Sequence, residues 1–350
     1  MTTSIKQGGI ETFYWEVAKE LQDRGIEVEL ISGRGNFIKY SDIPLKQFDF
    51  TSRDKIIDLG NRFRKWGERI SFFKNAYPYL KKQNYDYFLI HKPLDFFTAY
   101  FMKKINPNLR VIFVSGGEDF YGFDKFFSKY IDYMFAVSRD NANIIKNRYK
   151  RDVQILHNGV NIELFKRDED IRKEYRKKYK LDNKKVLLSV GRIVGWKGYQ
   201  LVIKTIKDLD VKYVLIGDGE YLNELKKLAK QENVDDKVLF LGSVSNKELY
   251  KYLNMGDVFV QPSIGHEAFG ITIVEAMACG LPVIASYNGG MKDIIIEGRN
   301  GFFFEINNIE NLKEKIQNAL NYKFIDVRKY VIDNFTWEKT IDNLLGQIKK

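Results

Sequence analysis

Short apolar runs alternate with helical patterns along all 350 residues of the chain. Apolar positions recur at helical spacing over 9–25, GIETFYWEVAKELQDRG, and apolar runs such as YFLI (87–90) and VIFVS (111–115) follow. A charged helical stretch occupies 168–181, and the alternation then restarts with VLLSVG (186–191). Strands that are apolar on both faces and separated by helices predict parallel sheets covered by helices.

The restart of the pattern predicts two doubly wound α/β domains, each of Rossmann-like topology. A chain of this length is also better divided between two cores than buried in one. We place the first domain at 1–160 and the second at 161–330, and we expect a C-terminal helix at 331–350 to pack back on the first. Ligands of such sheets bind beyond the carboxyl ends of the strands, so a cleft between the domains is the expected site.

Composition narrows the class of protein. With 44% hydrophobic residues and 6 prolines the chain is not disordered. A single cysteine, Cys279, excludes an internal disulfide framework and fits a reducing compartment. The N-terminal sequence MTTSIKQGGIETF lacks the apolar core of a signal peptide, and no run of 18 apolar residues occurs. We therefore expect a cytoplasmic protein, with at most a peripheral contact on the inner face of the membrane.

The net charge of +11 lies mainly in the first half of the chain. It indicates an anionic partner or serves only solubility. Residues 53–82 carry 9 Lys and Arg against 3 Asp and Glu, interleaved with Trp66, Phe72 and other apolar residues. This mixture suits an anionic bilayer surface. A core-facing helix with snorkelling lysines is the alternative, and RNA binding is the least favoured of the three.

A glycine-punctuated loop after one predicted strand carries two cations. The stretch SVGRIVGWKG (189–198) contains Arg192 and Lys197. A guanidinium fork and a lysine point charge suit a diphosphate. The spacing is not that of a Walker A loop, and no G-x-G-x-x-G follows a strand. On these residues alone, a solvated loop is an equal alternative.

Two glutamates flank an expected helix start in GHEAFGITIVEAMACG (265–280). Free backbone N–H groups around Gly270 would form an anion site. Carboxylates repel phosphates, so Glu267 and Glu275 must address hydroxyl groups, with Glu275 placed for a ribose and Glu267 for another polyol. A diphosphate flanked by two polyols describes a nucleotide sugar. The alternative is a glutamate that only complements the helix dipole.

Taken together, these stretches resemble the E-x₇-E region of family 4 glycosyltransferases, retaining enzymes of the GT-B fold. The resemblance covers nearly the whole chain and implies two Rossmann-like domains facing across a cleft. It extends to the Gly-Gly loop and first helix, the segment between the domains, the phosphate loop and the C-terminal helix of that family, which match GGIETFYWEVAKEL (8–21), VSRDNANIIKNRY (137–149) with VQILHNGVNIELF (153–165), VGRIVGWKG (190–198) and FTWEKTI (335–341).

The resemblance implies a role for each matching residue. Arg192 and Lys197 would neutralise the diphosphate, and Glu275 would bind the ribose. Glu267 would contact hydroxyls of the transferred sugar, and His91, after a predicted strand, would reach over that sugar. Arg192, Lys197, Glu267 and His91 are the predicted catalytic residues. The predicted donor-binding set adds Glu275, Gly8, Gly9, Ser243, Val244, Ala268, Phe269, Gly270, Ile271 and Thr272.

The mechanism implied is retention of anomeric configuration by front-face attack, in which the leaving phosphate takes the acceptor proton. Catalysis would be mainly electrostatic, with domain closure. We expect no metal and no other cofactor, because the nucleotide sugar is a substrate and Asp168-Glu169-Asp170 is better interpreted as the start of a solvated helix. His157 and His266 are expected to pack or orient neighbours.

Two departures from the family pattern affect the prediction. Only MTTSIKQ precedes Gly8, where the family has a full strand, so the chain starts late or the strand is abbreviated to Thr2–Ile5. Ser245 and Asn246 stand where guanine-using relatives carry an acidic residue, which favours uracil.

We therefore predict a hexosyltransferase that moves a sugar from a UDP-sugar to a glycan or lipid-linked acceptor in the assembly of a cell-surface polysaccharide or glycolipid. A sugar-nucleotide epimerase of the same fold and a non-catalytic nucleotide-sugar-binding relative are the alternatives.

Overall fold

A computed structural model describes residues 8–36 and 38–348, which divide into two compact units. Unit 2 comprises Gly159–Thr336, and unit 1 comprises the described residues before and after it. The boundary expected at residue 330 falls inside helix α13 (Val327–Asn334), which belongs to unit 2. Helix α14 (Trp337–Ile348) packs on α1 (Gly9–Asp23) within unit 1. The strand expected at Thr2–Ile5 lies outside the described residues.

Unit 1 holds parallel strands in two sheets, one of order β1-β2 and one of order β3-β4-β5-β6. Buried aromatic side chains such as Phe72, Phe96 and Phe113 fill its main core. Its strands are β1 (Leu30–Gly33), β2 (Leu45–Phe48), β3 (Tyr87–Ile90), β4 (Arg110–Ser115), β5 (Tyr133–Ala136) and β6 (Gln154–Ile155), and its other helices are α2 (Asn61–Leu80), α3 (Phe96–Ile105), α4 (Asp124–Phe127) and α5 (Arg139–Tyr149).

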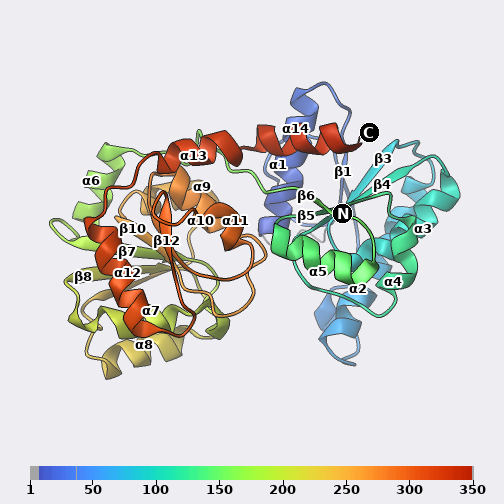
Figure 1. Cartoon of the computed structure of the whole chain (residues 1–350). Helices are drawn as coiled ribbons and strands as arrows, with labels where there is room; N and C mark the ends of the chain where they lie inside the picture. Colours follow the sequence, from blue (N-terminus) through green and yellow to red (C-terminus); the bar gives the residue numbers. More distant parts are fainter. Residues whose placement is uncertain (1–7, 37, 349–350) are drawn as a thin grey trace. The chain divides into compact units, whose positions relative to one another are not determined.

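Unit 2 is a doubly wound sheet of six parallel strands in the order β12-β11-β10-β7-β8-β9 (Figure 1). Its strands are β7 (Lys185–Val190), β8 (Val211–Ile216), β9 (Val238–Gly242), β10 (Val258–Gln261), β11 (Val283–Ser286) and β12 (Gly301–Phe304). Its other helices are α6 (Glu169–Lys178), α7 (Tyr199–Thr205), α8 (Leu222–Gln231), α9 (Asn246–Leu253), α10 (Ile271–Ala278), α11 (Met291–Ile294) and α12 (Ile309–Asn321).

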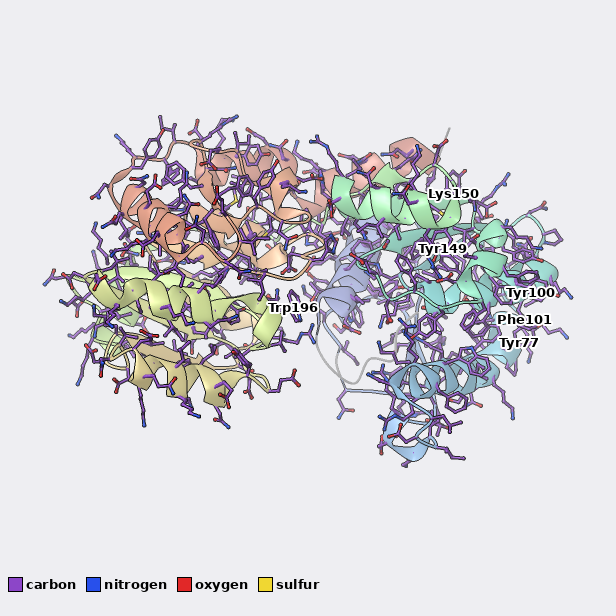
Figure 2. The ribbon with its side chains drawn as sticks, turned by 60° about the horizontal axis from the view of Figure 1, so that its bottom comes forward. Tyr77, Tyr100, Phe101, Tyr149, Lys150 and Trp196 are labelled. Atoms are coloured by element: carbon purple, nitrogen blue, oxygen red, sulfur yellow. The ribbon has the colours of Figure 1, made fainter. Side chains whose placement is uncertain are left out.

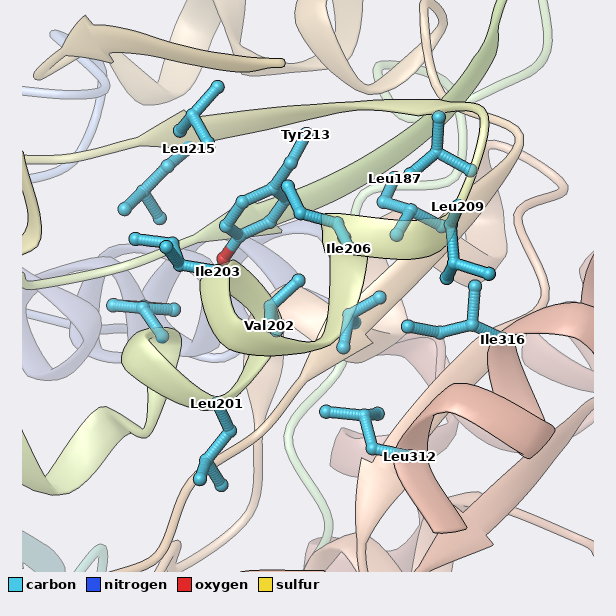
Figure 3. Packing of buried hydrophobic residues seen from close by; sticks show 14 of the residues in the cluster. Leu187, Leu201, Val202, Ile203, Ile206, Leu209, Tyr213, Leu215, Leu312 and Ile316 are labelled. Atoms are coloured by element: carbon cyan, nitrogen blue, oxygen red, sulfur yellow. The ribbon is translucent and has the colours of Figure 1, made fainter. Parts of the chain in front are cut away.

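Helices cover both faces of the unit 2 sheet because its central strands are apolar on both faces. Helices α7, α8 and α12 form one layer, and α6, α9, α10 and α13 form the other. The first layer encloses the core in Figure 3, where Tyr213 of β8 lies among Leu187, Val202 and Ile206. This two-layered cover is the arrangement that the sequence pattern predicts.

Helix α6 begins as the acidic triplet indicates. The Asp168 carboxylate accepts hydrogen bonds from the backbone N–H groups of Asp170 and Ile171, each at 3.0 Å, and so caps the helix. Arg172 then donates to the carbonyl of Gly256 at 2.6 Å and pairs with Asp257 at 2.5 Å. The triplet therefore starts a helix that is docked on the sheet.

The two parts of the basic segment 53–82 lie in different surroundings. From residue 61 it forms α2, where Phe72 and Phe73 are buried in the core of unit 1. The earlier apolar residues stand in solvent, since Ile57 is 76% and Leu59 69% exposed. The core-facing alternative is therefore correct for the second half of the segment, and the exposed first half leaves the bilayer alternative open.

Candidate functional site

Three loops of unit 2 meet at one edge of its sheet. Because β8, β7 and β10 are parallel neighbours, their carboxyl ends lie on the same edge. The loop after β7 carries Arg192 and Lys197, and the loop after β10 carries Glu267. This is the edge at which open α/β sheets bind ligands.

Backbone contacts hold these loops together. Gly198 has φ +74°, and a Cβ atom there would lie 1.9 Å from the carbonyl oxygen of Pro262. Gly217 has φ +141°, and a Cβ atom there would lie 1.9 Å from the carbonyl oxygen of Gly191. Only glycine fits such positions. The N–H groups of Ile264 and Gly265 both donate to the Trp196 carbonyl, at 2.9 and 3.0 Å.

This packing brings together two predicted catalytic residues that are far apart in the sequence. Lys197 Nζ donates to Glu267 Oε2 at 2.5 Å, and their side chains are only 12% and 16% exposed. Lys197 Nζ also lies 4.8 Å from the ring centroid of Trp196. The indole of Trp196 stands at the surface of unit 2 (Figure 2) and is 36% exposed.

A second group of contacts fixes the backbone of Glu267. The N–H of Gly290 donates to the Glu267 carbonyl at 2.7 Å, and Asn288 Nδ2 donates to the Gly265 carbonyl at 2.6 Å. A Cβ atom on Gly289 would lie 2.1 Å from the Glu267 carbonyl oxygen. The Asn-Gly-Gly sequence at 288–290 therefore holds the backbone of the loop that carries Glu267 in place.

Helix α10 starts at Ile271 after Gly270, whose φ is +100°. The first N–H groups of any helix have no acceptor within the helix, so Ile271 and Thr272 present donors. Glu275, one turn further, is 5% exposed, and its Oε1 lies 3.5 Å from Asn246 Nδ2. Phe269 packs its ring on Phe335, at 5.9 Å between centroids, so any donor contact there is through its backbone.

The remaining predicted residues of unit 2 border the same edge. Arg192 is exposed, and Ser243 and Val244 follow β9, exposed and half-buried respectively. Ala268 follows Glu267, and its carbonyl oxygen packs against Gly290.

The hydroxyl of Tyr199 is buried beside the loop that follows β7, 2.7 Å from where a Cβ atom of Gly191 would stand. Burial, with smaller electrostatic contributions from Tyr213 and Glu267, raises the Tyr199 pKa well above its usual value.

The predicted residues of the first domain lie in unit 1. Gly8 precedes helix α1, and a Cβ atom there would lie 2.8 Å from Glu11 Oε2, whereas Gly9 faces open space. His91 follows β3 and is 6% exposed, with its ring 5.0 Å from that of Phe13. Burial lowers the His91 pKa to about 3, so the imidazole is neutral near pH 7. A neutral imidazole can donate one hydrogen bond and accept another without placing a charge at this position.

Sequence reasoning missed the residues beneath Glu267. Gln261 Nε2 and Ser263 Oγ both lie 3.3 Å from Glu267 Oε2, and Gln261 Nε2 donates to Ser263 Oγ at 3.0 Å. A glutamine closing the apolar run VFVQ was the available signal. A buried amide at the end of a central strand requires a polar partner.

The described residues contain neither a metal-binding cluster nor a helix able to cross a membrane. Over 8–36 and 38–348, no group of three or more His, Cys, Asp or Glu side chains is arranged to hold a metal ion. Within the same residues, every helix is too short or too polar to cross a membrane.

Two family models match almost the whole chain between them. Residues 7–164 match Glycosyltransferase Family 4, and residues 171–336 match Glycosyl transferases group 1. The chain therefore belongs to the family 4 glycosyltransferases, as the motif resemblance predicts.

Relatives agree with this assignment. An uncharacterized glycosyltransferase of Methanocaldococcus jannaschii is 32% identical over 62% of this chain, and a GDP-mannose-dependent α-(1-6)-phosphatidylinositol monomannoside mannosyltransferase of Mycolicibacterium smegmatis is 27% identical over 51%. The matches span 60% and 51% of the lengths of these relatives.

Solved structures share the fold. Sucrose-phosphate synthase from Thermosynechococcus elongatus matches with a TM-score of 0.83 and 19% identity, over 99% of this chain and 94% of that one. Anabaena HepE in complex with UDP and glucose matches with a TM-score of 0.79 and 19% identity, over 99% and 97%. The fold is GT-B, as predicted from the sequence.

Proposed function

We propose that the chain is a retaining glycosyltransferase that moves a sugar from a UDP-sugar to a glycan or lipid-linked acceptor in the assembly of a cell-surface polysaccharide or glycolipid. The observation that carries the proposal is the direct contact of Lys197 with Glu267, on loops from β7 and β10. A cation for phosphate and a carboxylate for hydroxyls stand side by side, with Glu275 on the following helix. This combination fits a diphosphate that joins two polyols.

The proposed donor is a UDP-sugar. The segment Ser243–Asn246 has no carboxylate to pair with guanine, and Asn246 lies beside Glu275. Anabaena HepE, which shares the fold, was solved with UDP. The mycobacterial relative is named for GDP-mannose, so GDP-sugars are the comparison that any assay needs.

Each residue has a proposed task in unit 2. Arg192 and Lys197 neutralise the diphosphate and stabilise the charge that develops on the leaving nucleotide. Glu275 accepts hydrogen bonds from the ribose hydroxyls, and Glu267 accepts them from the transferred sugar. The backbone donors of residues 268–272 and the side chains of Ser243 and Val244 complete the contacts with the nucleotide. Gly8, Gly9 and His91 belong to unit 1, and their donor contacts stay predictions.

No side chain is assigned as a nucleophile. In the proposed reaction, the acceptor hydroxyl attacks the anomeric carbon from the face that the phosphate leaves. The bond between the anomeric carbon and the oxygen of the distal phosphate breaks as the acceptor oxygen bonds to that carbon. The acceptor proton passes to this departing phosphate oxygen, and the nucleoside diphosphate leaves. The protein contributes orientation and electrostatic stabilisation, so no metal ion is required.

We further propose that an aromatic face of unit 1 rests on an anionic bilayer. This face comprises the exposed rings of Phe63, Trp66, Phe101 and Phe126. Rings connect along it, for example Tyr100 to Phe101 at 5.1 Å and Tyr77 to Phe101 at 6.1 Å (Figure 2).

Cations border the same rings. Lys104 and Lys129 lie over Tyr100 and Phe126, at 4.7 and 4.4 Å. Aromatic rings edged by lysines suit the headgroup region of a negatively charged membrane, where a lipid-linked acceptor would be found.

Proton NMR of the chain incubated with UDP-, GDP- and ADP-sugars tests the proposed reaction. We expect slow hydrolysis of a UDP-sugar, unaffected by EDTA, and an α-linked product when an α-linked donor and a sugar acceptor are supplied. Arg192→Ala and Lys197→Ala should each lower turnover roughly 100-fold.

The other outcomes contradict the proposal in different ways. Conversion of the donor to its epimer would identify an epimerase, and a β-linked product would exclude retention. Binding without turnover in all three donor series would identify a non-catalytic relative. Turnover of GDP-sugars alone would refute the proposed nucleotide.

A further inference from the structure

Strand β10 ends in a buried amide directly before the loop of Glu267. Its residues Val258, Phe259 and Val260 are apolar and buried, as expected for a central strand, but Gln261 is also 0% exposed. Gln261 pairs in register with Ala285 of β11. Burying a primary amide costs free energy unless its polar atoms are bonded, so this position needs an explanation beyond packing.

The hydrogen bonds determine which way this amide points. Gln261 Nε2 donates to Ser263 Oγ at 3.0 Å and to Glu267 Oε2 at 3.3 Å. The reversed amide would place its oxygen against the carboxylate. Ser263, which is also 0% exposed, can then use its own hydroxyl hydrogen for Glu267 Oε2 at 3.3 Å. Gln261 Oε1 has no partner among the described residues, so the amide meets only half of its bonding capacity.

These bonds distinguish the two oxygens of Glu267. Oε2 takes all three donors, which are Lys197 Nζ at 2.5 Å, Gln261 Nε2 and Ser263 Oγ. Within the described part of the chain, no donor contacts Oε1. One oxygen is therefore anchored, while the other is free to accept a hydrogen bond from a ligand.

The three donors differ in how far a ligand can disturb them. Lys197 is a flexible cation, and a bound diphosphate would attract its ammonium group. Gln261 and Ser263 are fully buried and carry no charge, so phosphate has no such effect on them. They can keep the orientation of Glu267 when Lys197 turns to the phosphates.

We propose that Gln261 is a positioning residue that, with Ser263, holds Oε2 of Glu267 so that Oε1 faces a hydroxyl of the donor sugar. The identity of the ligand rests on the proposed function, whereas the orientation of Glu267 does not. Gln261 acts through Glu267 and touches no substrate itself.

Two variants of Gln261 test the proposal. Gln261→Met keeps the length of the side chain but has no donor, and Gln261→Glu keeps its shape but replaces the donor with a second carboxylate. Thr205→Val is the matched control, because its hydroxyl is 2% exposed and donates to the Leu201 carbonyl at 2.7 Å within α7. All three variants lose one buried hydrogen-bonding group.

Turnover of the nucleotide sugar, affinity for UDP and melting temperature are compared. Loss of a hydrogen bond to a charged group corresponds to about tenfold or more. We expect turnover to fall at least that far in both Gln261 variants, with UDP affinity within about twofold of wild type. For Gln261→Met we also expect a melting temperature close to that of Thr205→Val. A role in folding alone would lower UDP binding and turnover together.

A crystal structure of Gln261→Met gives a readout that does not depend on the donor. A Glu267 carboxylate that has left its present orientation supports the proposal, and an unchanged Glu267 overturns it. If Gln261→Met does not fold, Ser263→Ala serves for the same comparison. A displaced Glu267 in a chain that turns over no nucleotide sugar contradicts the proposed function but still supports the positioning role.

Discussion

Glu267 and Glu275 carry the same charge in different surroundings. The carboxylate of Glu267 forms an ion pair with Lys197 at the edge of the sheet where the loops meet. Glu275 lies on helix α10, where it is 5% exposed and borders Asn246, the first residue of α9. In the proposed function, Glu267 binds a group next to the phosphates and Glu275 binds a group further along the nucleotide.

Substituting each glutamate with glutamine separates these roles. Glu275→Gln removes a charged acceptor worth about 1.5–3 kcal/mol, so UDP should bind at least about tenfold more weakly. Glu267→Gln should bind free UDP like wild type and lose sugar transfer. Isothermal titration calorimetry with UDP measures the first effect, and equal UDP affinity in the two variants would contradict this division.

His91 makes stability depend on pH. Burial, with a smaller contribution from Lys92, lowers its pKa to about 3, against about 6.5 in the unfolded chain. The unfolded chain therefore binds more protons below pH 6.5, and stability falls as the pH is lowered from there towards 3. Between pH 7 and pH 5 the contribution lost is about 2 kcal/mol.

Urea unfolding of wild type and His91→Gln at both pH values measures this contribution. Glutamine does not titrate, so the stability gap between the two chains should narrow by about 2 kcal/mol at pH 5. Thr205→Val is the control, because neither side chain titrates, and its gap should not change. A His91→Gln gap that stays constant would mean that His91 takes up a proton as readily in the folded chain as in the unfolded chain.

Candidate site residues could be selected from sequence motifs, but the contacts between them could not. The spacing around the start of α10 was sufficient to select Glu267 and Glu275. The bond from Lys197 to Glu267 joins positions 70 residues apart, and it depends on β7 lying next to β10. Strand order is a property of the tertiary fold. Gln261 and Ser263 lie only six and four residues before Glu267, and they were missed because the sequence does not show that the loop returns the Glu267 carboxylate to the end of β10.

At the scale of elements, helix α6 is attached to the sheet by charge. Asp257 accepts from Arg172 at 2.5 Å, from Arg176 at 3.3 Å and from the Val186 N–H at 2.7 Å. Its side chain is 22% exposed, so water screens these contacts only in part. A single carboxylate thus joins α6, β7 and the start of β10.

Removing that carboxylate should loosen the helix. Asp257→Ala leaves two partly buried arginines without their anion, and we expect the free energy of unfolding to fall by about 3 kcal/mol. Asp333→Ala breaks an exposed pair with Lys329 and should cost less than about 0.5 kcal/mol. Chemical denaturation compares the two, and equal effects would show that α6 is held by its apolar face alone.

Cations on helix α2 allow the proposed contact with an anionic bilayer to be tested. Arg62 and Lys74 are exposed, whereas Lys65 pairs with Asp119 at 3.0 Å and is less available to lipid. Each cation near an anionic surface contributes about 1 kcal/mol, so replacing Arg62 and Lys74 with serine should weaken binding to anionic vesicles about 30-fold at low salt.

Vesicle co-sedimentation measures this binding. Lys227→Ser with Lys230→Ser, on exposed positions of α8, changes the net charge equally and should leave binding unchanged. Raising the salt concentration to 1 M should release the wild type, since the Debye length falls to about 3 Å. Equal losses in both double variants would mean that net charge, and not this face, attracts lipid.

The elements themselves were largely predictable. Runs that are apolar on both faces became central strands such as β4, β7 and β10, because burial on both faces requires that composition. Strand β2 was missed because its sequence LKQF alternates only weakly, and among residues 8–36 and 38–348 its one partner strand is β1. Strand β12 (GFFF) was missed among the turn residues around it and lies at the edge of the described sheet, next to β11.

At the scale of the whole chain, unit 2 holds Arg192, Lys197, Glu267 and Glu275. Hydrogen exchange of the full chain with saturating UDP should therefore show new protection at 191–198, 243–246 and 267–275. Ligand at 100 times its dissociation constant adds about 2.7 kcal/mol to stability. Amides of α2 in unit 1 are the internal control, and protection confined to unit 1 would place the nucleotide elsewhere.

The glycines under the site also constrain how this protein can be altered. Carbonyl oxygens stand 1.9 Å from the Cβ position of Gly198 and of Gly217, and 2.1 Å from that of Gly289. Libraries that mutate these positions would consist mostly of chains with a broken loop framework. Changes in sugar or base preference are therefore expected at Trp196 and residues 243–246, because side chains at these positions can vary without moving the backbone. Natural divergence and directed evolution meet the same restriction, so variants with altered donor choice should cluster at these few positions.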